Sequence, residues 1–167
     1  MNGFYNTPQS ELRNTSSRKS KFAEFKYISA WYIFGFNLIT LGIYVMYWMY
    51  SRANLINSIH PKQINPSVIS GYVVTYILLI VLPIASMMGF HSEAVEKTNL
   101  VLTIANFVLH MILLFTIRAR LLEFADEEGA NDFTIDPVIT FFGVNIYLQY
   151  VINKRINQIF PPSQSTN

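Results

Sequence analysis

Polar side chains recur at helical spacing inside the long apolar stretches of this chain. Residues three or four positions apart lie on one face of an α-helix. Three stretches carry such a set, and together the sets could line a polar seam inside a helical bundle. The members are Asn37, Thr40 and Tyr44 in the first stretch, Thr103, Asn106 and His110 in a later one, and Asn145, Gln149 and Asn153 in the last.

This seam allows two interpretations. It could be a hydrophilic path with His110 as a titratable relay, because an ionisable residue inside a membrane helix is by default a candidate functional residue. Its side chains could instead form hydrogen bonds between helices, each contributing about 0.6 kcal/mol on average. We favour the hydrogen bonds. A proton or ion path usually has a carboxylate or a paired charge at mid-membrane depth, and the apolar stretches contain none.

Residue patterns for catalysis or metal binding are lacking. The chain has no cysteine, and its histidines, His60, His91 and His110, are far apart in the sequence. It has no HExxH, G-x-S-x-G or P-loop motif. The acidic stretch from Glu123 to Asp136 lacks the spacing and the glycine of an EF-hand. We therefore expect a protein that is not an enzyme and has no catalytic residues, no metal and no cofactor.

The apolar stretches themselves predict the fold class. Hydrophobic residues make up 51% of the chain and charged residues 13%, whereas soluble domains carry about 25% charged residues. A bilayer core needs roughly 20 helical residues. We predict an all-α, polytopic transmembrane bundle of four short helices without a soluble domain. Its membrane domain spans residues 27–153, with helices at about 27–50, 66–90, 98–124 and 137–153.

The fourth of these helices is short for a crossing. Only 16 residues run from Pro137 to Ile152 before Lys154, and roughly 17 is the lower limit for a span. The helix could cross a thinned bilayer or lie partly in the interface. We favour crossing, because aromatic side chains surround it.

Polar tails flank the membrane domain. We predict that residues 1–26 form a basic, flexible N-terminal tail, in which Phe22 and Phe25 could anchor on anionic lipid. We predict that residues 154–167 form a C-terminal tail. With four crossings, the two tails and the loop 91–97 share one side, which holds eight of the twelve Lys and Arg residues. Cytoplasmic segments are enriched in Lys and Arg, so both termini are expected in the cytoplasm.

Aromatic residues flank the apolar stretches where a membrane surface would lie. Amphipathic rings favour the headgroup level. We expect interface anchors at Trp31, Tyr47, Trp48, Tyr147 and Tyr150.

Two segments of the chain echo each other at a constant offset. The first reads Ile43-Tyr44-x-x-Tyr47-x4-Arg52-x-Asn54-x-Ile56, and the second reads Ile146-Tyr147-x-x-Tyr150-x4-Arg155-x-Asn157-x-Ile159. In a four-crossing topology these helices would run antiparallel, which would make the echo an inverted repeat of the kind found in transporters. The alternative, which we favour, is that both segments are membrane-exit motifs with interfacial tyrosines followed by a cation.

One family resemblance rests on two motifs. The element Thr40-Leu41-Gly42-Ile43-Tyr44-x-x-Tyr47-Trp48 and the later Tyr147-Leu148-Gln149-Tyr150-x-x-Asn153 resemble signatures of the DUF4234 family of small prokaryotic membrane proteins. The resemblance implies a bacterial inner-membrane location. It implies no catalytic residues, because the family has no established activity.

These observations lead to three expectations about function. The first is a non-enzymatic accessory, assembly or interaction subunit, whose partners are the lipid bilayer and a second copy or another membrane protein, and not a nucleic acid. The second is a small channel or transporter that uses the polar seam. The third is an immunity protein against a membrane-acting toxin, for which the sequence offers no feature on either side.

Overall fold

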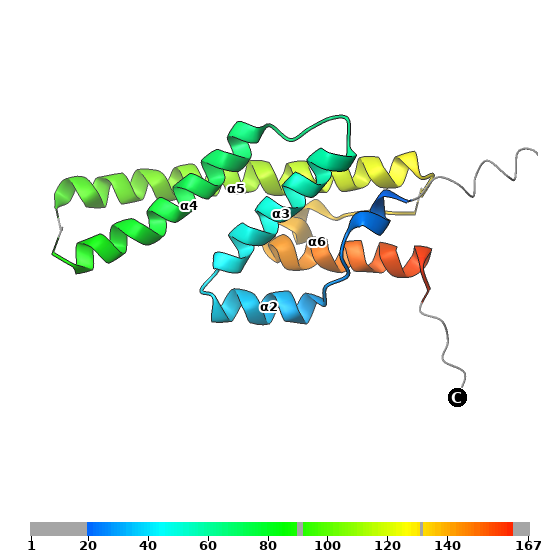
Figure 1. Cartoon of the computed structure of the whole chain (residues 1–167), viewed down its shortest axis with the longest axis horizontal. Coiled ribbons are helices and arrows are strands. Elements are labelled where there is room, and N and C mark those ends of the chain that lie inside the picture. Colours follow the sequence, from blue (N-terminus) through cyan, green and yellow to red (C-terminus); the bar gives the residue numbers. More distant parts are fainter. Residues whose placement is uncertain (1–19, 90–91, 131, 162–167) are drawn as a thin grey trace, which may run out of the picture.

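The computed structural model describes residues 20–89, 92–130 and 132–161. This part of the chain is helical and contains no strand (Figure 1). The elements are η1 (Lys21–Glu24), a 3-10 turn, followed by α2 (Ala30–Ile39), α3 (Ile43–Ile59), α4 (Pro66–Met87), α5 (Glu93–Glu127) and α6 (Pro137–Ile159).

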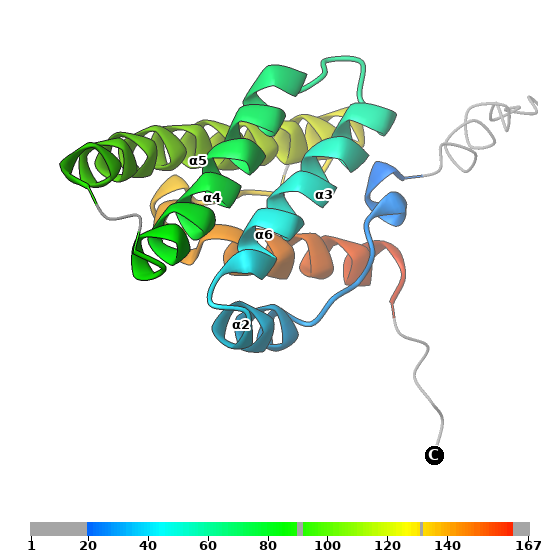
Figure 2. The same ribbon diagram turned by 60° about the vertical axis from the view of Figure 1, so that its left-hand side comes forward.

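The first apolar stretch is two helices and not the single helix predicted for residues 27–50. α2 ends at Ile39, and α3 begins at Ile43. Between them Leu41 has φ 50° and Gly42 has φ 91°, and a left-handed backbone cannot continue a right-handed helix. The Thr40 hydroxyl accepts from Tyr44 N at 3.0 Å and so caps the start of α3. The chain therefore turns sharply here, and α2 and α3 form an open helical hairpin, in which α2 is seen almost end-on and α3 lies across the picture (Figure 2).

α4 and α5 form a second, longer hairpin. The Asn65 side chain caps α4 and Pro66 opens it, while the Ser92 side chain caps α5, as expected for helix starts. Both helices are long and apolar enough to cross a membrane, and only 11% and 22% of their most apolar windows are buried. A core helix of a soluble protein would be mostly buried, whereas most of the apolar surface of this hairpin is exposed.

α6 is longer than predicted and is broken near its start. Asp136 caps it at Ile139 N, and Pro137 follows. Val144 has φ 44° and ψ −130°, which kinks the helix after its first two turns. The remainder runs to Ile159, so that residues 154–159, predicted to belong to the C-terminal tail, are helical.

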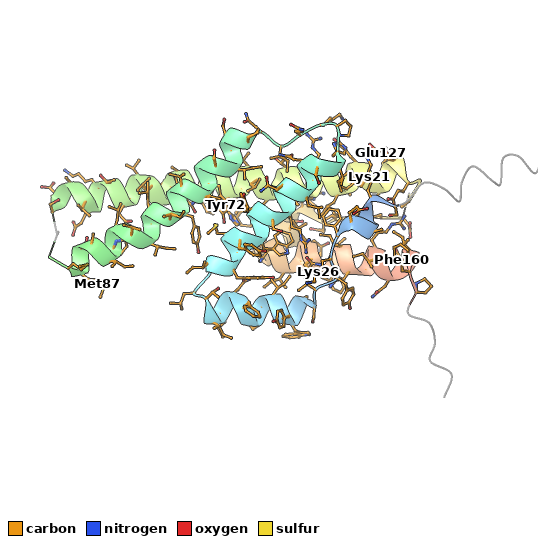
Figure 3. The ribbon with its side chains drawn as sticks, viewed as in Figure 1. Lys21, Lys26, Tyr72, Met87, Glu127 and Phe160 are labelled. Carbon is orange, nitrogen blue, oxygen red and sulfur yellow. The ribbon has the colours of Figure 1, made fainter. Side chains whose placement is uncertain are left out.

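Several segments of the chain contact the C-terminal end of α5. Glu128 accepts from Ser20 Oγ at 2.7 Å and from Lys21 N at 2.9 Å, and it pairs with Arg155 of α6 at 3.4 Å. Glu123 lies 3.2 Å from His60, which follows α3. Lys21 and Glu127 lie at this end of the molecule, and Met87 lies at the other (Figure 3).

The predicted N-terminal tail ends earlier than residue 26. Phe22 and Phe25 are buried, and their rings pack at 6.2 Å from Phe124, with Phe133 completing the cluster. These two residues, predicted as lipid anchors, therefore belong to the core. The part of the tail before Ser20 lies outside the described residues.

Helix direction corrects the inverted-repeat interpretation. His60, at the end of α3, and Arg155, near the end of α6, both contact the C-terminal end of α5. α3 and α6 thus run toward the same end of the molecule, and the echo is not inverted. The echo also appears in the backbone. Two non-glycine residues of the described part have a positive φ, Leu41 and Val144. They stand at the same offset from each other as Tyr44 and Tyr147.

Candidate functional site: a polar cluster and cavity around Arg52

The amides of the predicted seam, together with His110, fall into two separate groups. The first joins α4 to α5. Asn106 Nδ2 donates to Tyr72 O at 3.1 Å and to Thr75 Oγ1 at 2.8 Å. His110 Nδ1 lies 3.1 Å from the Tyr72 hydroxyl. These contacts cross-link the two helices of the hairpin, which is the hydrogen-bonding role favoured from the sequence.

Two threonines of the predicted seam form local hydrogen bonds and belong to neither group of amides. Thr103 Oγ1 donates to Asn99 O at 2.8 Å, one turn earlier. Thr40 Oγ1 donates to Phe36 O at 2.7 Å while it caps α3. The Thr103 hydroxyl thus stays within α5, and the Thr40 hydroxyl joins α2 to the start of α3 at the turn between them.

The second group is centred on Gln149 of α6, which is fully buried. Its Oε1 accepts from Trp48 Nε1 and from Arg52 Nη2, both at 3.0 Å. Its Nε2 donates to Asn153 Oδ1 at 2.8 Å and to Lys26 O at 3.3 Å. One side chain thus joins α6 to α3 and to the segment before α2.

Two further amides complete this group. Asn153 Nδ2 donates to Ile28 O at 2.6 Å, which fixes the chain just before α2. Asn37 Nδ2 donates to Asn145 Oδ1 at 3.3 Å, which ties α2 to α6 next to the kink. The amides predicted on α2 and α6 therefore meet each other, but they do not meet Asn106 or His110.

Arg52 is the residue of this group that sequence reasoning missed. The first predicted helix ends at about residue 50 and leaves Arg52 outside the membrane, yet Arg52 lies within α3 and is 5% exposed. Nη2 also reaches Lys26 O at 3.4 Å, and the guanidinium lies near the rings of Phe25 and Trp48. Burial lowers the pKa of Arg52, and nearby Tyr44 opposes this shift. An arginine keeps its charge despite such shifts, so the site holds a buried cation.

A cavity of about 580 Å³ opens beside Arg52. Lys26 and Ser51 contribute further polar groups to its wall, and four tyrosines contribute phenol rings. The complete lining is Lys26, Tyr27, Ile28, Ser29, Tyr32, Tyr44, Tyr47, Trp48, Ser51 and Arg52. Tyr44 therefore belongs to this cavity and not to a seam shared with α5.

The predicted interface anchors divide between surface and interior. Trp31, Tyr47 and Tyr150 are exposed, as an anchor requires. Trp48 is 2% exposed and is bonded to Gln149. Tyr147 is half-buried, and its hydroxyl accepts from Asp136 N at 3.1 Å. Two of the five predicted anchors, Trp48 and Tyr147, thus form hydrogen bonds within the protein.

In its described residues, this is an all-helical protein that combines a two-helix hairpin able to span a membrane with a buried polar cluster built on Arg52 and Gln149. The chain belongs to the family described as Domain of unknown function (DUF4234), whose model matches residues 28–158, from just before α2 to the end of α6. No curated protein and no solved structure matches the chain.

Proposed function

We propose that this protein is an integral membrane protein with two crossings, α4 and α5. In this arrangement α2, α3 and the start of α6 enter the bilayer from one side and do not cross it. Ten helical residues cover about 15 Å, half of the roughly 30 Å core, so α2 is too short to span. Figures 1 and 2 support this, since the α4–α5 hairpin extends well beyond the α2–α3 turn.

The distribution of charge supports one orientation. Among the described residues, Lys97 is the one lysine or arginine near the α4–α5 loop, and the others lie in the half of the molecule that contains the C-terminal end of α5. The positive-inside rule then favours a cytoplasmic location for this half. Both tails would be cytoplasmic, as expected from the sequence, but so would the loop between α3 and α4.

We further propose that the protein acts by packing against another membrane protein or a second copy of itself, without catalysis. The observation that carries this proposal is the unpartnered apolar face of the α4–α5 hairpin. Apolar side chains are exposed on α5 from Leu100 to Ile112, whereas most of the apolar side chains from Leu113 to the helix end are buried. Asn106 finds its partners within the hairpin, which supports packing over a hydrophilic path.

Photo-crosslinking in intact cells tests this proposal. A photoreactive residue at Val101 or Ile104, both exposed, is expected to give a defined protein adduct. The same residue at Leu113, which is buried, is the matched control and is expected to give none. Adducts with lipid alone from both exposed positions would contradict the proposal.

A further inference from the structure

We propose that the cavity beside Arg52 binds the phosphate group of an anionic phospholipid. The inference rests on the proposed membrane location and adds a ligand to it. The ligand would place its phosphate against the guanidinium, with Lys26 at the rim, and its acyl chains along the apolar surface of the α2–α3 hairpin.

The first reason is that Arg52 is a buried cation without a counter-charge. Within the described residues no carboxylate lies within ion-pair distance of it, and its acceptors, Gln149 Oε1 and Lys26 O, are neutral. Its Nε is buried without a hydrogen-bond partner. Burial of a charge without a partner is costly, and an anion in the adjoining cavity would offset that cost.

The internal echo supplies a comparison within the same molecule. Arg155 occupies the position in α6 that Arg52 occupies in α3. Arg155 pairs with Glu128 at 3.4 Å. The arginine of the second segment thus has a carboxylate partner at the end of α5, whereas Arg52, which lines a cavity, has none among the described residues.

The lining of the cavity suits a phosphate ester. Such a group offers several acceptor oxygens, and arginine binds it through a planar fork of N–H donors. Only Nη2 of Arg52 is used by described residues. Tyr32, Tyr44 and Tyr47 line the same space, and their hydroxyls form no hydrogen bond within the described part of the chain.

The depth of Arg52 favours a lipid over a soluble anion. Nine residues separate it from Ile43 at the start of α3, a rise of about 14 Å, close to half of the bilayer core. Because α3 runs obliquely toward the charged end of the molecule (Figure 1), this rise along its axis moves the guanidinium away from the apolar α2–α3 turn and toward the side where headgroups would lie. The turn itself is apolar and exposed, with Leu41 91% accessible.

A binding titration on the purified full chain tests the proposal. The Trp31→Phe variant leaves Trp48, which lines the cavity, as the sole tryptophan. In neutral detergent micelles with phosphatidylcholine, added phosphatidylglycerol is expected to change Trp48 fluorescence saturably and to raise the thermal midpoint. In the same background, Arg52→Gln is expected to weaken the apparent affinity at least about tenfold, because it removes a charge-assisted fork.

Matched variants and a second anion sharpen the test. Arg155→Gln removes the same charge from the echoing position and is expected to bind like the parent, and inorganic phosphate alone is expected to have little effect. Arg52→Lys keeps the charge, so it is the variant to use if Arg52→Gln does not fold, and it is expected to bind more weakly than the parent because it lacks the fork.

Several results would overturn the proposal. The first is that a folded Arg52 variant binds phosphatidylglycerol with the same affinity as the parent. The second is that the parent shows no preference for phosphatidylglycerol over phosphatidylcholine. The third is that inorganic phosphate alone saturates the fluorescence change in place of lipid. Each can occur with α4 and α5 crossing the membrane as proposed, so failure of the lipid site is distinguishable from failure of the topology.

Discussion

At the scale of single residues, Gln149 has the largest structural role in the polar cluster. Its amide is fully buried and accepts from Trp48 and Arg52 while it donates to Lys26 O and Asn153. A buried donor that loses its acceptor costs about 1–3 kcal/mol, and a charged donor costs more. The side chain is therefore expected to be necessary for stability.

Replacement of Gln149 tests this role. Gln149→Leu leaves Trp48 Nε1 and Arg52 Nη2 without their shared acceptor and is expected to lower the free energy of unfolding by roughly 3 kcal/mol. Gln149→Glu keeps an acceptor and adds a charge opposite Arg52, so its loss is expected to be smaller. Unfolding by denaturing detergent in mixed micelles measures both. Equal losses for the two variants would show that shape alone, and not the acceptor, matters.

The sequence shows Gln149 as a seam residue but does not show its partner. Helical spacing places Asn145 and Gln149 on one face, and the structure does bury that face. The same reasoning does not predict the burial of Arg52, because a cation that follows an uncharged run is typical of the point where a helix leaves the membrane. Arg52 is buried because α3 packs against α6. This tertiary contact cannot be predicted from the spacing of residues along the chain.

At the scale of elements, the turn between α2 and α3 decides the architecture. Gly42 has φ 91°, a conformation that costs an L-residue roughly 1–2 kcal/mol. A Cβ there would also lie 3.1 Å from the Tyr76 hydroxyl. Glycine is therefore the one residue type that adopts the conformation of position 42 without strain, next to Leu41, which has φ 50°.

A pair of glycine variants tests this element. Gly42→Ala is expected to lower the free energy of unfolding by roughly 1–2 kcal/mol. Gly35→Ala is the control, because Gly35 lies within α2 and an added Cβ meets no atom within 4 Å, so this change is expected to stabilise the helix by about 0.5–1 kcal/mol. Thermal midpoints in detergent provide the readout. A Gly42→Ala protein as stable as the parent would argue for a continuous first helix.

The elements also show where sequence reasoning succeeds. The apolar stretches that contain α4 and α5 exceed the length of a crossing and have clear caps, so their existence and type follow from composition. The first stretch has the same charge-free length whether it forms one helix or two short ones, and a glycine within an apolar run does not by itself end a helix. The break at Leu41 and Gly42 therefore needed the structure, as did the kink at Val144.

At the scale of the whole molecule, the α4–α5 hairpin extends beyond a cluster of shorter helices. Ion pairs from Lys21, Lys62 and Arg155 converge on the carboxylates at the end of α5, so the segments of the charged end are joined to one another. Toward the opposite end, α4 and α5 expose apolar side chains, and the charges described there are those of Glu93, Glu96 and Lys97 at the start of α5. This polarity along the long axis is what a protein inserted mainly from one side of a bilayer would show.

The central claim is that α2 and α3 turn back within the membrane, and the loop between α3 and α4 tests it most directly. The cysteine-free chain allows single cysteines at Gln63, at Met88 and at Phe160 to be labelled with an impermeant thiol reagent in intact cells and in inverted vesicles. The two-crossing topology predicts that Gln63→Cys and Phe160→Cys react from the cytoplasmic side and Met88→Cys from the outside. Labelling of Gln63→Cys from the outside, on the opposite side from Phe160→Cys, would mean that the first apolar stretch crosses the membrane and would contradict the account.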